Sequence, residues 1–172
     1  MALDPTLRAR REATVLEHMN AENAHEFARC IDAFSHARYE IIPTGEVWDG
    51  RDGVNELLLQ NKTAFPDFKF VPQATHYADD AVFVEGRFTG THDGNWRGLP
   101  ATGRKIDFPL IIAFLFEEDR MVCERTYFDL GTLLRQLGVA RDPTSMSGRI
   151  ETMVSHPLVV GRAFLGRLFR RD

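Results

Sequence analysis

The 172-residue sequence has few of the features that mark whole classes of protein. Its two cysteines, Cys30 and Cys123, lie far apart and match neither a zinc site nor a redox pair, so we expect reduced thiols in a cytoplasmic protein. No apolar run approaches the roughly 20 residues that a membrane span needs. The charged N-terminal residues differ from a secretory signal peptide. The net charge of -4 gives no reason to expect a nucleic-acid partner.

Motifs of metal and cofactor chemistry are also missing. There is no HExxH, no paired CxxC and no EF-hand spacing in the sequence. Neither GRFTG nor GLPATG has the pattern of a phosphate-binding loop, and no GxSxG nucleophile motif occurs. We therefore expect no metal and no cofactor, and any activity would be acid–base chemistry by side chains alone.

The sequence does contain an ordinary globular composition, 44% hydrophobic and 27% charged, and a clear change of pattern along the chain. The first part favours helices, with a break at residues 20–23 and a loop that contains Trp48 at residues 45–50. Period-two alternation follows and favours strands. Helices are predicted over residues 5–18, 24–34 and 54–64, and strands over 39–42, 68–76, 81–91, 105–117 and from 120. This order predicts an α+β domain in which helices cover one face of a curved, mostly antiparallel sheet.

The C-terminal part is different in character. Residues 141–148 have linker composition, and a basic amphipathic helix is predicted from about Pro157 to Arg170. The chain thus divides into a domain over residues 1–140 and a linker with a helix over 141–172. Such a helix can contact a membrane surface, but packing on its own domain or on a partner is the more common arrangement.

The stretch from Arg120 to Gly138 carries the most candidate chemistry. On the predicted strand, Arg125, Tyr127 and Asp129 share one face, and a cation, a phenol and a carboxylate are costly to bury without a function. Asp129 also directly precedes a predicted helix, where an aspartate serves as an N-cap. A cap needs a carboxylate of lowered pKa, whereas a general base needs a raised one, and both interpretations stay open. Arg125 could likewise form a structural salt bridge to a neighbouring strand.

Three longer stretches then carry a resemblance: WDGRDGVNELL with AFPDFKF, GTHDGNWRGLPATGRK, and FEEDRMVCERTYFDLGTLLRQLG. In this order, over about residues 8–140, the chain resembles the SnoaL-like polyketide cyclases of the NTF2-like superfamily. The resemblance implies a cone-shaped fold with a mostly apolar pocket, and an aldol ring closure without metal or cofactor. Asp129 is similar in position to the family's catalytic aspartate. The assisting histidine of the family has no counterpart, because Ile112 and Phe114 occupy the comparable positions, although His92 could substitute for it.

We therefore expect aldol-type cyclisation or isomerisation of a hydrophobic, carbonyl-bearing, polyketide-like small molecule. Asp129 would be the base, Arg125 would tune it, and Tyr127 and His92 would orient or polarise the carbonyl. The expected pocket lining is Trp48, His76, Trp96, Phe108, Leu110, Ile112 and Phe114.

Two other functions stay open. A non-catalytic module for ligand binding or dimerisation would need Asp129 only as a cap, and the apolar strand over residues 105–117 favours it. Epoxide hydrolysis ranks third, because it needs a second aspartate for which the sequence offers no clear candidate. The resemblance also implies a homodimer through the outer face of the sheet.

Overall fold

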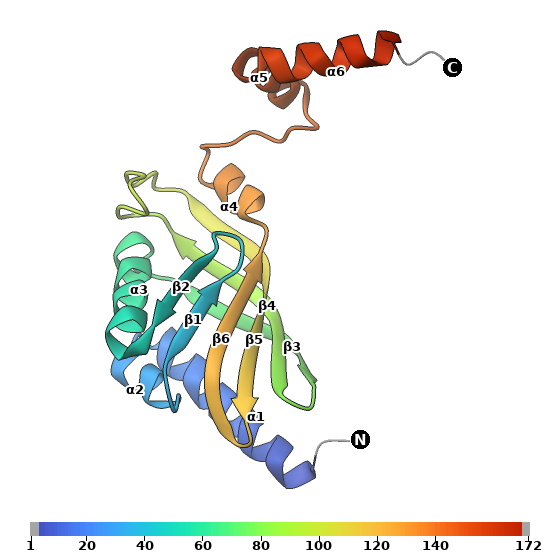
Figure 1. Ribbon diagram of the computed structural model, residues 1–172. Coiled ribbons are helices and arrows are strands. Elements are labelled where there is room, and N and C mark those ends of the chain that lie inside the picture. Colours follow the sequence, from blue (N-terminus) through green and yellow to red (C-terminus); the bar gives the residue numbers. More distant parts are fainter. Residues whose placement is uncertain (1–3, 170–172) are drawn as a thin grey trace.

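The computed structural model describes residues 4–169 and shows a curved sheet with helices against one side (Figure 1). The sheet has six strands in the order β2-β1-β6-β5-β4-β3. The elements are α1 (Pro5–Asn23), α2 (Phe27–Asp32), β1 (Arg38–Ile41), β2 (Glu46–Asp49), α3 (Gly50–Ala64), β3 (Lys69–Tyr77), β4 (Ala81–Thr91), β5 (Lys105–Glu117), β6 (Arg120–Phe128), α4 (Leu130–Gln136), α5 (Met146–Ser155) and α6 (Pro157–Phe169). The predicted α+β class is confirmed.

Strands β3 to β6 form the predicted antiparallel meander, and β1 joins its β6 edge in parallel. Strand β5 is the clearest example of a half-buried strand, because its side chains alternate between the core and the outer face. Ile106, Phe108 and Leu110 are at most 4% exposed, whereas Asp107 and Pro109 between them are exposed. This alternation places an apolar wall on the side of the sheet that the helices cover.

Helix α1 is longer than predicted and runs unbroken through residues 20–23. The predicted break was wrong because a tertiary contact holds the polar last turn. The Asn23 side chain donates to the Phe70 carbonyl and accepts from the Phe70 amide, both at 2.8 Å. Helix α1 ends at Asn23 with Ala24 as its C-cap, and His25 follows in the left-handed region with φ 59°. The continuous helix places His18 and Glu22 one turn apart on the same face.

Two further elements differ from the prediction. The expected loop with Trp48 contains strand β2, in which Trp48 pairs with Tyr39 of β1. Helix α5 begins inside the predicted linker, where the Ser145 hydroxyl caps it by accepting from the Gly148 amide at 3.0 Å. Helix α6 begins at Pro157 as expected, and its predicted end at Arg170 lies outside the described residues. Figure 1 shows α5 and α6 standing apart from the sheet.

The connection between β4 and β5 is held against the end of α3. The amides of Asp93 and Gly94 both donate to the Ala64 carbonyl, at 3.0 and 3.1 Å. A Cβ atom at Gly94 would collide with the Thr63 carbonyl, so this approach requires glycine. The contact fixes the following residues beside the sheet. Within residues 4–169, no helix has the length and apolar composition that crossing a membrane requires.

Candidate functional site

A mostly apolar cavity of about 100 Å³ lies between the inner face of the sheet and helices α1 and α3. Five of the residues expected to line a pocket do so: Trp96, Phe108, Leu110, Ile112 and Phe114. Apolar walls of this kind suit a hydrophobic ring system and lower the local dielectric constant, which strengthens any electrostatic interaction inside.

Besides Asn61 of α3 and Arg97 of the β4–β5 connection, a group of polar side chains enters this lining from α1, β1 and β6. Glu22 comes from α1, Tyr39 from β1, and Glu124 with Thr126 from β6. The Tyr39 hydroxyl donates to Glu22 Oε2 at 3.3 Å, and the Thr126 hydroxyl donates to Glu124 Oε1 at 3.3 Å. Glu124 is 3% exposed, so the site holds a nearly fully buried carboxyl group. Buried carboxyl groups require compensation, and the residues behind the lining supply it.

His18 is the centre of that compensation. Its ring is fully buried, with Nδ1 3.0 Å from the Cys30 carbonyl oxygen and Nε2 2.9 Å from Glu124 Oε2. Burial by itself lowers the pKa of His18, but hydrogen bonds with Cys30 and Glu124 outweigh it and raise the pKa well above 6.5. An imidazolium that donates from both nitrogens therefore pairs with the Glu124 carboxylate.

Glu22 occupies a different electrostatic position. Its Oε2 lies 3.6 Å from His18 Nε2, and its side chain is 19% exposed toward the cavity. Burial and then the negative charge of Glu124 raise the pKa of Glu22 to about 7, against weaker lowering by His18 and Tyr39. Two carboxyl groups that share one imidazolium cannot both ionise easily. Glu22 is thus a carboxyl group that gains and loses a proton near neutral pH.

The neighbouring Tyr39 and Cys30 remain protonated. Burial raises the pKa of the Tyr39 phenol well above its usual value, and the charge of Glu124 adds to the effect. Burial also raises the pKa of the Cys30 thiol. Tyr39 therefore presents a hydroxyl donor at the cavity, and Cys30 is a structural thiol and not a reactive one.

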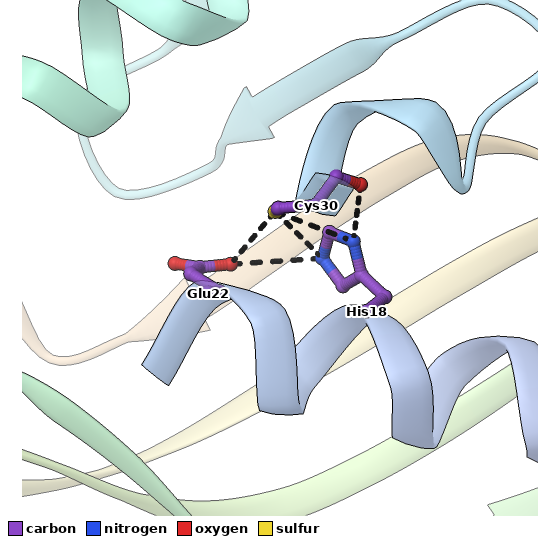
Figure 2. Close-up of side chains that lie close together, drawn as sticks. All are labelled: His18, Glu22 and Cys30. Carbon is purple, nitrogen blue, oxygen red and sulfur yellow. Dashed lines mark hydrogen bonds and ion pairs between the residues drawn. The ribbon is translucent and has the colours of Figure 1, made fainter. Parts of the chain in front are cut away.

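The donor atoms of His18, Glu22 and Cys30 lie within 4.8 Å of one another, a spacing that could hold a metal ion (Figure 2). Their present contacts are those of a proton network. Both nitrogens of His18 already have partners, and the thiol of Cys30 has its raised pKa, whereas a metal needs a free imidazole nitrogen and a thiolate. The geometry therefore fits acid–base chemistry better than metal coordination.

Asp129 lies outside the cavity lining, at the start of α4. It accepts hydrogen bonds from the Gly131 amide at 2.9 Å and the Thr132 hydroxyl at 2.5 Å, and it pairs with Arg135 at 3.1 Å. Its side chain is 62% exposed. The Thr132 hydrogen bond, followed by the Gly131 amide and Arg135, lowers the pKa of Asp129. The capping role is confirmed, and the role of general base remains a prediction that these surroundings do not favour.

Arg125 and Tyr127 project from the opposite face of β6 to Glu124 and Thr126, because adjacent residues of a strand alternate. Arg125 Nε donates to Glu40 Oε2 on β1 at 2.5 Å, which is the structural salt bridge that the sequence left open. Tyr127 is 40% exposed on the outer face. These residues are not brought together with the cavity.

His92 is fully buried behind the lining and beside Phe65, with ring centroids 5.2 Å apart. Its Nδ1 is 3.0 Å from the Thr102 hydroxyl, Nε2 has no partner among the described residues, and burial lowers its pKa. Trp48 packs against the hydrophobic core, and His76 is exposed on β3, where it pairs with Glu85 at 3.0 Å. None of the three belongs to the cavity lining.

A family model described as SnoaL-like polyketide cyclase matches residues 11–137. The chain belongs to this family. Several solved structures share the fold of this chain. TsrD from Streptomyces laurentii is 25% identical, with a TM-score of 0.67 over 80% of this chain and 99% of that one. A phenazine biosynthesis-related protein from Pseudomonas aeruginosa is 18% identical, with a TM-score of 0.71 over 86% and 94%.

The description of a third solved structure names the fold. This protein from Catenulispora acidiphila, described as having a ketosteroid isomerase-like fold, is 15% identical, with a TM-score of 0.64 over 73% of this chain and 92% of that one. No curated protein matches the chain significantly. The comparisons thus establish the family and the fold.

Sequence reasoning missed the polar group at the cavity wall, Glu22, Tyr39 and Glu124, and His18 behind it. Two signals were available. His18 and Glu22 have the four-residue spacing that stacks side chains on one helix face, once the helix is read as continuous. Glu124 and Thr126 share one face of β6 with the apolar Phe128, opposite to the face of Arg125 and Tyr127.

Proposed function

We propose that the protein catalyses cofactor-free proton transfer on a hydrophobic, carbonyl-bearing small molecule, of the cyclisation or isomerisation type, with Glu22 as general base. The observation that carries this proposal is a carboxyl group with a pKa of about 7 at the wall of an apolar cavity. A general base works best when its pKa lies near the operating pH, and an ordinary glutamate is too weak a base for this role.

The residues have distinct roles in the proposed step. The Glu22 carboxylate removes a proton from the carbon next to the substrate carbonyl, and the electron pair of that C–H bond moves to form the enolate. The neutral Tyr39 hydroxyl, which donates to Glu22 before the reaction, turns its one proton to the enolate oxygen as Glu22 becomes protonated. In a cyclisation, the enolate carbon then forms a bond to a second carbonyl carbon of the same molecule. The protonated Glu22 returns its proton to the new alkoxide, so the enzyme ends as it began.

The His18 and Glu124 pair positions and tunes this base. The charge of Glu124 raises the pKa of Glu22. The positive charge of His18, paired with Glu124, offsets the repulsion between the two carboxylates. The rest of the lining, which is mostly aromatic and aliphatic, supplies the substrate preference for an apolar ring system. Membership of the SnoaL-like family supports the reaction type, and the identity of the natural substrate stays open.

The test uses a simple ketone because proton abstraction is detectable without ring closure. Wild-type protein is incubated with 2-tetralone in deuterated buffer, and exchange of the protons next to the carbonyl is followed by NMR. We expect the wild type to accelerate exchange and Glu22→Gln to lose about 100-fold or more of that acceleration. Asp129→Asn is the matched control, since it removes a carboxylate outside the cavity and should retain exchange.

The outcomes separate the candidate functions. Loss of exchange in Asp129→Asn with retention in Glu22→Gln would return the base to Asp129. If a folded wild-type protein leaves proton exchange at the background rate, the non-catalytic ligand-binding module is favoured. Circular dichroism of each variant shows whether a loss reflects unfolding.

A further inference from the structure

We infer that the cavity accepts an anionic ligand, an apolar ring compound with a carboxylate or similar acidic group, which Arg97 binds after exchanging its partner Glu46. This inference rests on the proposed function, since it takes the same cavity as the substrate site. Arg97 lines both the cavity and a polar groove between α3 and the β4–β5 connection. It therefore stands where a ligand in the cavity would meet solvent.

The backbone holds Arg97 in this position at some cost. Arg97 and Gly98 have φ angles of 52° and 85°, and the amide and carbonyl groups of Trp96 and Leu99 pair across them at 2.9 and 2.8 Å. This is a tight hairpin turn with two left-handed residues. Such turns prefer asparagine followed by glycine, and here arginine occupies the asparagine position. A non-glycine residue in the left-handed region is uncommon, and such conformations gather at ligand sites.

Among the charged side chains around the cavity, Arg97 is the one that can bind an anion. In the described parts of both linings it is the sole cationic side chain, and the Glu22 and Glu124 carboxyls come from other elements, α1 and β6. Asp52 and Glu56 of the groove are exposed, so water and salt screen them. The Arg97 side chain is about a quarter exposed, and a guanidinium can donate to both oxygens of a carboxylate at once.

Glu46 of β2 pairs with Arg97 and acts as an internal substitute for the ligand's acid. The pair is partly exposed, and ion pairs of this kind contribute little to stability. Glu46 also keeps a second partner, because the Thr44 hydroxyl donates to its Oε2 at 3.0 Å. If Arg97 moves to a ligand, the Glu46 carboxylate therefore still has a hydrogen-bond partner. Binding of an acid becomes an exchange between two carboxylates, with the apolar cavity supplying the preference for the ligand.

The test compares two ligands of the same shape, 2-naphthoate and the uncharged 2-naphthamide, by titration calorimetry against wild-type protein. We expect naphthoate to bind about 10-fold more tightly. Arg97→Gln should remove this preference and leave naphthamide binding unchanged. Glu46→Gln should strengthen naphthoate binding several-fold, because it removes the competing carboxylate. The two variants break the same ion pair, so a purely structural role predicts the same effect from both, whereas the inference predicts opposite effects on naphthoate.

Arg87→Gln is the control for loss of a positive charge, because Arg87 pairs with Asp107 at 2.6 Å away from both linings. It should leave both affinities unchanged. Equal binding of the two ligands, binding of neither, or a preference for naphthoate that survives Arg97→Gln would overturn the inference. Failure of the proposed function is visible separately, since binding needs no turnover. A preference for the acid with unchanged exchange in Glu22→Gln would remove the base assignment and leave the anion site standing.

Discussion

Glutamine in place of Glu22 should make the stability of the protein less sensitive to pH. In the wild type the folded carboxyl has a pKa of about 7, against 4.5 for an ordinary glutamate. Below about pH 4.5 both the folded and the unfolded states carry the proton, so burial costs nothing in ionisation. As the pH rises, the unfolded state releases its proton first, and the free energy of unfolding falls until the folded carboxyl also ionises, at about pH 7.

The size of the effect follows from that difference in pKa. Each unit is worth about 1.4 kcal/mol, so the wild type should lose up to about 3 kcal/mol of stability between pH 4.5 and pH 8 through this group. This is an upper value, because the side chain is 19% exposed and water screens part of the repulsion from Glu124. Glutamine has nearly the same shape and does not titrate, so the variant lacks this loss.

Urea unfolding at half-unit steps from pH 4.5 to pH 8 measures the difference directly. The free energy of unfolding of Glu22→Gln minus that of the wild type should rise across the range, by up to about 3 kcal/mol. Glu17→Gln is the matched control, because Glu17 is an exposed glutamate of the same helix. Parallel profiles for Glu22→Gln and the wild type would refute the reasoning, because they would show that Glu22 does not titrate near neutrality. The general-base assignment would fall with it.

Three further results are expected. The rate of 2-tetralone exchange should rise with pH and level off above about pH 7, as Glu22 loses its proton; a rate that is flat from pH 5 to pH 8 would contradict this. Tyr39→Phe should lower the exchange rate by about 100-fold while the protein stays folded, since the donor to the enolate is lost; an unchanged rate would remove Tyr39 from the mechanism. At pH values above the pKa of aspartate in the unfolded chain, Asp129→Ala should lower the melting temperature, because the cap of α4 is lost. The same variant should leave the exchange rate unchanged. That stability difference should vanish as the pH falls through the lowered folded pKa, and a difference that persists in acid would mean that the carboxylate is not its source.

Much of the fold was predictable because its signals are local. The alternation of Ile106, Phe108 and Leu110 with polar or exposed neighbours follows from the geometry of a strand that is buried on one side, whatever lies across from it. The cap at Asp129 and the glycine after α4, with φ 78° at Gly138, are likewise properties of a few consecutive residues. Local signals could not predict that residues 20–23 are helical, because hydrogen bonds between the Asn23 side chain and the Phe70 backbone decide where the helix ends.

The candidate site was decided by tertiary structure. Sequence patterning correctly identified β6 as a strand that carries charged and polar residues, but it could not say which face the helices cover. That choice separates Glu124, in the cavity, from Arg125, in an outer salt bridge. His18 and Glu124 are 106 positions apart in the chain, and only the closure of the sheet over α1 places them 2.9 Å apart. The pKa of Glu22 follows from that proximity, because burial and a neighbouring carboxylate are properties of the folded protein, and no residue carries them alone.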